Sequence, residues 1–317
     1  MTTGSGEPSQ APGARACTGS RQARHPSWAD ANDARAGDAG LGRRAFLKAG
    51  LGAAAAIGFG MPALRAANTD ALRVQRLAWA GIRLQLANAT LFLDPLINAK
   101  VWDSALKDRI IPVDDAVGDT YVLATHRHPD HFDPTAVAAA LRKGGTFVHA
   151  AGTSFHPIPD GARERISPPW EPQLLGDFTA TPVPAVDGYG DQQVSWVVSG
   201  GGRRILHGGD TLWHGEWWRI GRQFGPFDAV FLPINGARFS WRKPASDASA
   251  VLTPEQAMSA ATILGARRLV PIHYGVSGAE GYAEVADALG RLQRASAPDG
   301  PSVQVLTPGQ WLDWGGD

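Results

Sequence analysis

The strongest structural signal in the sequence is the segment Tyr121-Val122-Leu123-Ala124-Thr125-His126-Arg127-His128-Pro129-Asp130-His131. It begins as a short buried strand and ends with four potential nitrogen or oxygen ligands within six residues. In an extended segment His126 and His128 alternate with Arg127, so both can point to one side. Pro129 then bends the chain, so that Asp130 and His131 can face a second metal ion beside the one that the two histidines could bind. Because burying so many ionisable groups without a partner is costly, the sequence predicts a metal centre.

Two more ligand candidates also follow apolar runs. Asp210 comes shortly after residues 204–206, and His273 comes directly after residues 269–272. The end of a strand is rigid, so the side chains that follow it can be held in register for a metal ion. The single cysteine, Cys17, lies in a segment that we expect to be removed. The ligands are therefore expected to be His, Asp and Glu, without a thiolate.

The composition excludes some classes of partner. The 317 residues include 30 basic and 30 acidic side chains, with no formal net charge at pH 7. This balance gives no electrostatic reason to expect nucleic acid or an anionic membrane as a partner. Hydrophobic residues make up 44%, which is ordinary for a packed globular domain.

The first 67 residues are predicted to be a leader. Residues 1–41 are rich in Gly, Ala, Ser, Pro and Arg, a composition that buries too little apolar surface to order the chain. The following run, residues 42–48, carries paired arginines and then Phe-Leu-Lys, and it resembles a twin-arginine export signal. The uncharged residues 49–64 are few and weakly apolar for a membrane span. An uncleaved N-terminal anchor is the alternative interpretation.

Cleavage near Ala66 or Ala67 would leave residues 68–317 as the mature chain, without a stable membrane span. We therefore expect the twin-arginine export machinery as a partner and a periplasmic or secreted location. No long polar linker divides residues 68–317, so the sequence predicts one domain there.

Strands and helices are predicted to alternate along the mature chain. The strand candidates are 74–79, 82–86, 90–93, 121–124, 146–149, 179–183, 194–198, 204–206, 229–233, 268–272 and 303–306. The helix candidates are 136–142, 216–224, 253–264 and 279–295. Asp133-Pro134 and Thr253–Gln256 carry helix-start signals. This order indicates an α/β fold in which sheets pack together with helices outside.

The chain resembles the metallo-β-lactamase superfamily over nearly all of residues 68–317. The matching stretches are Leu93-Asp94-Pro95, His126–His131, Gly209-Asp210-Thr211 and Pro271–Gly275. Within that superfamily the chain looks most like the branch of ascorbate-6-phosphate lactonase and N-acyl-phosphatidylethanolamine phospholipase D. The resemblance implies a four-layer αββα sandwich with one or two metal ions at the edge of its sheets. It says little about the substrate.

The resemblance also implies a ligand set for two divalent metal ions. The first ion would be held by His126 and His128, the second by Asp130, His131 and His273, and Asp210 would bridge both. The family usually adds a histidine to the first ion, in a segment of the form Pro-Ala-x-His. Here that segment reads Pro184-Ala185-Val186-Asp187, and Asp187 stands where the histidine would be.

Asp187 changes the charge that the centre is expected to carry. With Asp187 as a ligand, two divalent cations, three carboxylates and one bridging hydroxide sum to zero, whereas a histidine would leave one positive charge. A neutral centre acidifies bound water less and attracts anionic phosphodiesters less. We therefore expect a neutral reacting group, such as a lactone or an amide-like carbonyl. The alternative is that Asp187 is only a turn residue.

Zinc is the first expectation for both metal ions, and the extra carboxylate makes manganese or iron the alternatives. The predicted function is a metal-dependent hydrolase, in which a metal-bound hydroxide cleaves an ester, lactone or phosphodiester bond of a small-molecule or lipid-like substrate. Asp130 is expected to orient the nucleophile or to move its proton. Two other hypotheses are an iron-dependent oxidoreductase on the same scaffold and a non-catalytic metal-binding protein.

Several neighbouring side chains have two interpretations each. His214 is either a proton donor in the pocket or a structural residue. His207 is expected to be packed, or bonded to a ligand carboxylate. Six aromatic residues either form a wall over the metal ions or belong to the core, namely Trp213, Trp217, Trp218, Tyr189, Phe239 and Trp241.

Overall fold

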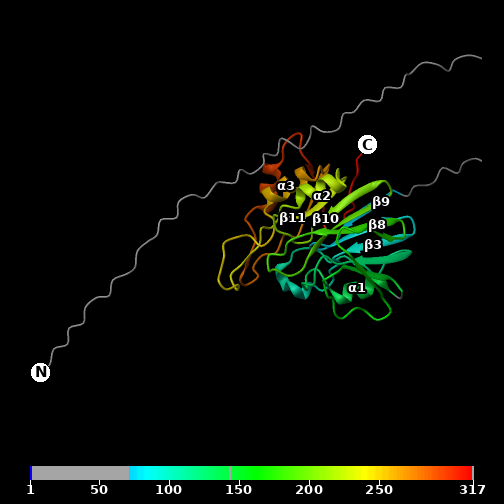
Figure 1. Cartoon of the computed structure of the whole chain (residues 1–317), viewed down its shortest axis with the longest axis horizontal. Helices are drawn as coiled ribbons and strands as arrows, with labels where there is room; N and C mark the ends of the chain where they lie inside the picture. The colour runs from blue at the N-terminus through cyan, green and yellow to red at the C-terminus, as the bar shows by residue number, and fades with distance from the viewer. Residues whose placement is uncertain (2–70, 143, 316–317) are drawn as a thin grey trace, which may run out of the picture. The chain divides into compact units, whose positions relative to one another are not determined.

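Two β-sheets form the centre of the structure, a computed structural model that describes Met1, residues 71–142 and residues 144–315 (Figure 1). The first sheet has six strands that lie in chain order. They are β1 (Arg73–Arg76), β2 (Ile82–Leu86), β3 (Ala89–Leu93), β4 (Asp119–Leu123), β5 (Thr146–Ala150) and β6 (Arg163–Ser167). The strands from β1 to β3 pair antiparallel, and those from β3 to β6 pair parallel. The expected leader and export signal lie outside the described residues.

The second sheet has seven strands in the order β15-β13-β11-β10-β9-β8-β7. They are β7 (Gln173–Leu175), β8 (Phe178–Pro184), β9 (Val194–Gly200), β10 (Arg203–His207), β11 (Ala229–Pro233), β13 (Arg268–Ile272) and β15 (Ser302–Val303). The strands from β7 to β10 pair antiparallel, and β10, β11, β13 and β15 pair parallel. A separate two-stranded ribbon pairs β12 (Arg238–Phe239) with β14 (Tyr282–Ala283).

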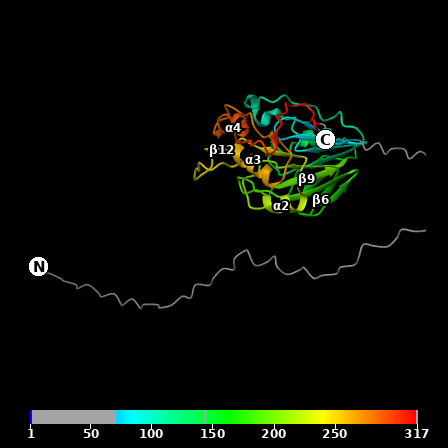
Figure 2. The same ribbon diagram turned by 90° about the horizontal axis from the view of Figure 1, so that it is seen from above.

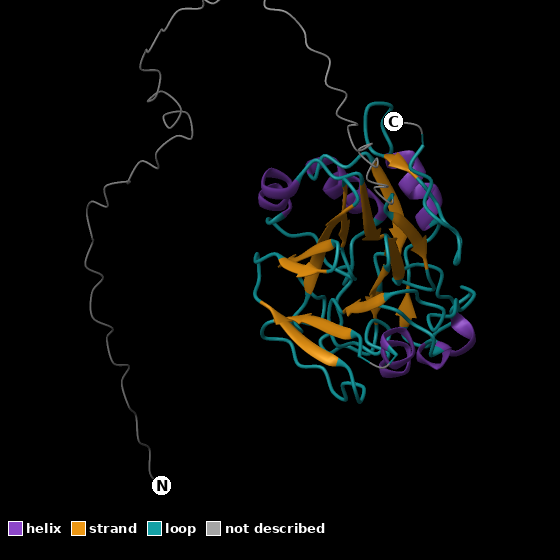
Figure 3. Cartoon of the chain, turned by 90° about the vertical axis from the view of Figure 1, so that its right-hand side faces the viewer, coloured by secondary structure: helices purple, strands orange, loops and turns teal. Residues whose placement is uncertain are grey.

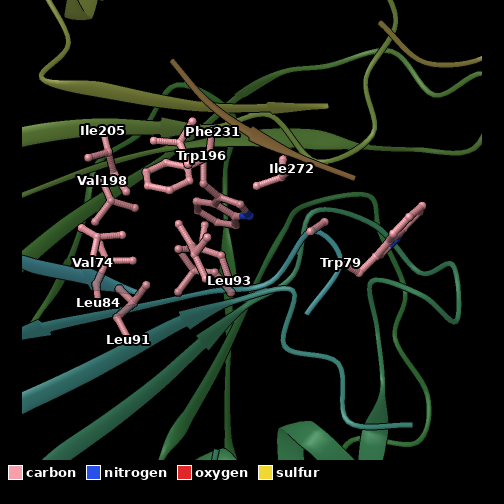
Figure 4. Close-up of a cluster of buried hydrophobic side chains, with 14 of the residues drawn as sticks. Val74, Trp79, Leu84, Leu91, Leu93, Trp196, Val198, Ile205, Phe231 and Ile272 are labelled. Atoms are coloured by element: carbon pink, nitrogen blue, oxygen red, sulfur yellow. The ribbon is translucent and has the colours of Figure 1, made fainter. Parts of the chain in front are cut away.

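The main core lies between the two sheets. Figure 4 shows Leu84 and Leu91 of the first sheet below Trp196, Ile205 and Phe231 of the second, all of them buried. Side chains in a strand point alternately to opposite faces, so every second residue of these strands enters this layer. The remaining buried residues of the same strands form two further clusters, one on the outer face of each sheet.

Helices cover both outer faces. On the first sheet, α1 (Pro134–Leu141) packs against β4 and β5. On the second, α3 (Pro254–Ile263) packs against β11 and β13, and it is flanked by α2 (Trp217–Phe224) and α4 (Ala288–Ala295). The layers are visible edge-on in Figure 3 and from above in Figure 2. The predicted αββα sandwich is therefore confirmed. None of the helices in the described ranges has the length and hydrophobicity needed to cross a lipid bilayer.

The predicted helix signals are seen at both places. The Asp133 side chain accepts from the backbone N–H of Thr135 at the start of α1, and Pro134 is its first residue. Thr253 and Gln256 form a reciprocal capping box at the start of α3. Each carboxylate, hydroxyl or amide oxygen satisfies a backbone donor that the helix itself cannot pair.

The last predicted helix is wrong in its first half. Residues 279–295 were expected to be helical, but only Ala288–Ala295 form α4. Gly281 has a φ of +69°, which a helix cannot contain, and Tyr282 after it pairs with Phe239 across β14 and β12. The expected strand at 303–306 is shorter, and β6 and β7 were missed. The strand β6 is a mostly exposed Arg-Glu-Arg-Ile-Ser run without apolar alternation.

The topology brings several strand ends to one edge of the sandwich. In the second sheet β8 and β10 both run antiparallel to β9, and β10 runs parallel to β11 and β13. The carboxyl ends of β8, β10 and β13 therefore lie at the same edge. In the first sheet the parallel strands β3 and β4 end together in the same way. Asp94, His126, Asp187, Asp210 and His273 all follow such ends.

Candidate metal centre

One group of four side chains combines ligands from both sheets. It contains His126, His128, Asp187 and Asp210, and one possible ligand atom from each lies within 4.8 Å of all the others. His126 Nε2 lies 2.9 Å from His128 Nδ1 and 3.6 Å from Asp210 Oδ1. Asp187 Oδ1 lies 3.7 Å from His128 Nδ1. The four atoms therefore converge on a space that fits one cation.

A second group contains Asp130, His131 and His273. Asp130 Oδ2 lies 3.9 Å from His131 Nε2 and 4.0 Å from His273 Nε2. The other carboxylate oxygen of Asp210, Oδ2, lies 4.0 Å from His273 Nε2. Asp210 thus presents one oxygen to each group. All seven predicted ligands lie in these two groups, and Asp187 is among them.

The donor atoms fit metal ions because the protein leaves them without other partners. Asp187 Oδ1, His131 Nε2 and His273 Nε2 are buried and have no hydrogen-bond partner among the described residues. Leaving a buried polar atom unpaired costs about 1–3 kcal/mol, and more when the group is charged. Cations held by the two groups would give all three atoms a partner. This is a physical reason for these buried atoms to face the interior of the two groups.

Two histidines are oriented by a buried aspartate behind them. Asp94 Oδ2 lies 2.8 Å from His131 Nδ1 and accepts a 2.6 Å hydrogen bond from Thr125 Oγ1. The Thr125 hydroxyl is in turn 3.0 Å from His126 Nδ1. With Nδ1 engaged on each ring, the Nε2 atoms face the centre. Carboxylates that hold metal-binding histidines in this way fix their tautomer and direction.

The loop from Asp187 to Asp191 holds the carboxylate of Asp187, the residue that stands where the family pattern has a histidine. Asp187 Oδ2 accepts backbone N–H groups of Tyr189 at 2.5 Å and Asp191 at 3.0 Å, so only Oδ1 is left for a cation. The Asp191 side chain reaches His128, with 3.0 Å between Oδ2 and Nε2, and accepts from Arg127 through Oδ1. One short loop thus holds a ligand and supports another. Sequence reasoning missed Asp191.

Replacing Asp191 is expected to weaken metal binding without unfolding the chain. Asp191→Asn removes the charge that holds His128 through Nε2, and such outer partners are typically worth about 10- to 100-fold in metal affinity. Competition with a chromophoric chelator measures the change. Glu164→Gln is the matched control, because Glu164 Oε1 lies 2.8 Å from Nε2 of His149, which is not in either group. Equal affinity of Asp191→Asn and the unaltered chain would contradict this role.

Burial and close charges shift the pKa values of the ligands in the metal-free chain. Burial raises the pKa of Asp210 to about 7. Burial by itself lowers the pKa of His131, but the carboxylates of Asp130 and Asp94 outweigh it and raise the pKa to about 9. Burial, and then the nearby His131, lower the pKa values of His126 and His273. At pH 7 the metal-free centre therefore retains the proton of His131, and Asp210 is partly protonated.

Metal affinity is consequently expected to rise with pH. At pH 7 a cation must displace the proton of His131 and part of the proton of Asp210, so binding releases protons. The apparent affinity should increase about tenfold per pH unit from 7 to 9, and more steeply below 7, where both groups are protonated. Calorimetric titration in buffers of different ionisation enthalpy measures the proton release. An affinity that is constant between pH 6 and about 8 would refute the assigned protonation.

The position of Asp210 is set by the close packing of the preceding glycine against Thr125. Gly209 before it has a φ of +67°, and a Cβ atom there would lie 3.0 Å from Thr125 Oγ1 and 3.1 Å from Thr125 Cβ. Only glycine adopts this conformation without strain. The contact joins the end of β10 to the segment that carries His126, so the bridging carboxylate is set directly against the first group of ligands.

An aromatic cavity of about 310 Å³ opens onto both groups. Its floor contains ligand side chains, and its walls are mainly apolar. The lining residues are Val101, Trp102, His128, Pro129, Asp130, Tyr189, Asp210, Phe239, Trp241, His273 and Tyr282. Tyr189, Phe239 and Trp241 of the predicted aromatic wall are therefore present, whereas sequence reasoning missed Trp102 and Tyr282.

The three tryptophans after Asp210 do not line this cavity. Trp217, the first residue of α2, is fully buried, and Trp213 and Trp218 form an edge-to-face pair that is partly exposed. Of the two interpretations, core packing therefore applies to Trp217, and none of the three tryptophans is part of the cavity wall. Unlike Phe239 and Trp241, these tryptophans are kept out of the cavity by the orientation of α2. The sequence pattern does not show that orientation.

His214 and His207 also lie away from the cavity. His214 stacks on Trp217 at 4.2 Å between ring centres, and its Nδ1 accepts from the backbone N–H of Glu216. Burial lowers the pKa of His214 to about 4, so the ring is neutral at pH 7. This geometry gives no support to a proton-donor role. His207 is packed as expected, but its Nε2 contacts the Ala80 carbonyl oxygen at 2.7 Å and no ligand carboxylate.

The αββα sandwich, with two groups of ligands at one edge of its sheets, defines a protein of the metallo-β-lactamase class. The family model described as "Beta-lactamase superfamily domain" matches residues 90–274. This match covers more than half of the chain and includes every predicted ligand. The chain therefore belongs to the beta-lactamase superfamily.

Curated relatives and solved structures share parts of this pattern. A UPF0173 metal-dependent hydrolase of Rubrobacter xylanophilus is 32% identical over 176 residues, which is 50% of this chain and 66% of that protein. An uncharacterised protein of Mycobacterium bovis is 29% identical over 61% of this chain and 54% of its own length. The chain thus spans between about half and two thirds of these relatives.

Among solved structures, the metallo hydrolase Igni18 of Ignicoccus hospitalis has a TM-score of 0.56 at 19% identity. That likeness covers 76% of this chain and 97% of the other. CmlA, a diiron β-hydroxylase from Streptomyces venezuelae, has a TM-score of 0.54 at 15% identity, over 77% of this chain and 54% of its own. At these identities the two likenesses show the fold.

Proposed function

We propose that this chain is a metal-dependent hydrolase that holds two divalent cations in the groups described above. The observation that carries the proposal is the convergence of unpartnered buried donor atoms from both sheets on the floor of an open cavity. The metal-dependent hydrolases among the curated relatives support it. When bound, the cations supply a water molecule of lowered pKa and a Lewis acid for an oxygen that gains negative charge.

The side chains of the chain have separate tasks in this proposal. Asp210, with one oxygen toward each group, would hold both cations. Asp130 lines the cavity, and its Oδ2 is oriented by a 3.2 Å hydrogen bond from Trp79 Nε1. It is the carboxylate placed to accept a proton from the attacking water. His126, His131 and His273 are neutral ligands at their Nε2 atoms.

The proposed bond is that of an ester or a lactone. Asp130, Asp187 and Asp210 bring three negative charges to the two groups, which with two divalent cations and a hydroxide leaves a neutral centre. A phosphodiester adds another negative charge at the reacting atom, and a neutral centre offsets it poorly. A neutral carbonyl gains its charge only in the transition state, where nearby cations stabilise it selectively.

We further propose that the chain is exported through the twin-arginine route to a periplasmic or secreted location. Support comes from the paired Arg43 and Arg44 and the following uncharged residues 49–64. A fusion of residues 1–70 to a reporter that is active only after export tests this, with Arg43→Lys and Arg44→Lys combined as the variant. Loss of export in the double variant is expected. Unchanged export would argue for another route.

The hydrolase proposal is tested by metal analysis and a matched substrate panel. Protein loaded in turn with zinc, manganese or iron is assayed with 4-nitrophenyl acetate, δ-valerolactone and bis(4-nitrophenyl) phosphate. We expect two ions per chain and chelator-sensitive turnover of the ester and the lactone above that of the phosphodiester. Iron-dependent oxygen consumption without hydrolysis would favour an oxidoreductase instead. Two bound ions without any turnover would favour a non-catalytic protein.

A further inference from the structure

Five aromatic rings form a continuous arc over the two ligand groups. Neighbouring ring centres lie between 4.7 and 5.5 Å apart, which is the normal spacing of tilted aromatic pairs. We call this set the aromatic arc. In spatial order it consists of Trp79, Trp102, Tyr282, Phe239 and Tyr189.

Each end of the aromatic arc touches a ligand histidine. Trp79 lies 4.1 Å from His273, a ligand of the second group, and Tyr189 lies 5.4 Å from His128, a ligand of the first. The arc therefore begins at one group and ends at the other, and all of its rings except that of the buried Trp79 line the cavity. Trp241 adds one more ring, 4.9 Å from Phe239, at the exposed side of the cavity.

Two polar groups of the arc are paired within the protein, and a third, Trp102 Nε1, is buried without a partner among the described residues. The Tyr282 hydroxyl accepts a 2.6 Å hydrogen bond from Asn235 Nδ2, and Glu284 shares this network. Trp79 Nε1 donates to Asp130. The walls therefore offer ring faces and edges to a substrate, and the polar atoms available to it are mainly those on the floor. Flat apolar groups are the ligands that such walls hold best.

No lysine or arginine is found among the described residues that line the cavity. Its charged side chains are the ligand carboxylates Asp130 and Asp210. The Arg242 guanidinium packs on one ring of the arc, with its central carbon 3.3 Å from the Tyr189 ring centre. Arg242 is exposed and does not line the cavity. An anionic group on the substrate would thus meet no cationic side chain among the residues that line the cavity, which would leave its desolvation poorly compensated at the walls.

We propose that the cavity takes an uncharged ester or lactone with a planar aromatic ring, the ring lying against the aromatic arc and the carbonyl over the ligands. This inference rests on the proposed hydrolase function and names its substrate class. The roughly 310 Å³ volume limits the substrate to about one bicyclic ring system with short substituents. A lipid with long acyl chains would have to leave most of its length outside.

The first experiment compares 3-isochromanone with δ-valerolactone, because the former is the same six-membered lactone with a fused benzene ring. In the zinc-loaded full chain, Trp241→Leu is expected to raise KM for 3-isochromanone about five- to tenfold, since an aromatic pair is worth about 0.5–1.5 kcal/mol beyond its buried area. KM for δ-valerolactone should change less than about twofold. Trp213→Leu is the matched control, because Trp213 is also partly exposed but does not line the cavity.

The second experiment separates this inference from the hydrolase proposal. Binding of 2-tetralone, which has the same bicyclic skeleton and no hydrolysable bond, is measured by calorimetry beside cyclohexanone and naphthalene-2-sulfonate. We expect 2-tetralone to bind at least about tenfold more tightly than either, and Trp241→Leu to weaken it selectively. Such binding without any lactone turnover would overturn the hydrolase proposal and keep the aromatic site. Equal binding of all three, or tighter binding of the sulfonate, would overturn the aromatic, uncharged substrate.

Discussion

Asp210→Asn is expected to lower kcat/KM for ester or lactone hydrolysis at least about 1000-fold, the largest effect of any single change proposed for this chain. Asp210 is the only predicted ligand with an oxygen toward each group, so its loss disturbs both cations. A thousandfold loss corresponds to about 4 kcal/mol of transition-state stabilisation, within the range that metal ions supply. The bound metal content should fall with the activity.

The control for this variant is Asp228→Asn. Asp228 is also partly buried, but it precedes β11 and so lies at the opposite edge of the same sheet, where it pairs with Arg203. The same substitution there is expected to leave metal content and kcat/KM within about twofold, because it removes no ligand. Full activity of Asp210→Asn, with both ions retained, would remove the proposed bridge.

Asp187→Ala is expected to empty the first group and to lower kcat/KM about 100-fold. The substitution removes Oδ1, the atom that the loop leaves free for a cation, and only His126, His128 and Asp210 are then left in that group. Metal analysis should show a decrease from two ions per chain toward one. The buried N-cap residue gives the control, because Asp133→Ala removes the acceptor of the Thr135, Ile97 and Asn98 backbone N–H groups. It should cost about 2–4 kcal/mol of stability and no metal.

Asp187→His tests the charge of the centre rather than its occupancy. Histidine restores a ligand but adds one positive charge, so two ions should bind again. Relative turnover should then move toward the phosphodiester by at least about tenfold, or 1.4 kcal/mol, as expected for one unit charge near the reacting atom. An unchanged ratio of ester to phosphodiester turnover would show that the charge of residue 187 does not select the substrate.

Much of the metal centre could be predicted from the sequence because its ligands carry short-range signals. His126, His128, Asp130 and His131 stand within six residues after an apolar run, and core packing alone rarely brings so many ionisable groups together. The α/β class, with sheets packed together and helices outside, followed from the order of the strands and helices, which depends on local periodicity. The four-layer αββα arrangement was implied by the family resemblance. The edge that unites Asp210 and His273 with this run followed from the family resemblance and from strand ends.

The rest depends on directions in space that periodicity does not encode. Asp191 supports His128 from 63 positions away, and the only local hint is a loop with glycines at 188 and 190. Trp102 and Tyr282 enter the cavity from separate segments, and β14 replaces part of an expected helix. His214 stands four residues after Asp210 yet faces Trp217. Outside the run from His126 to His131, proximity in sequence was therefore a poor guide to proximity at the centre.

The division of ligands between the two sheets has a mechanical consequence. His126, His128, Asp130 and His131 extend from the first sheet, whereas Asp187, Asp210 and His273 extend from the second. Loaded cations would therefore cross-link the two halves of the sandwich at one rim, much as a disulfide joins two segments. Ligands that bind only the folded state increase the free energy of unfolding with the logarithm of their excess over Kd. Chelation should therefore let the two halves separate at a lower temperature. The interior that they share would then be exposed to proteases. Resistance to degradation would then report on metal supply, even in a variant that has lost all turnover.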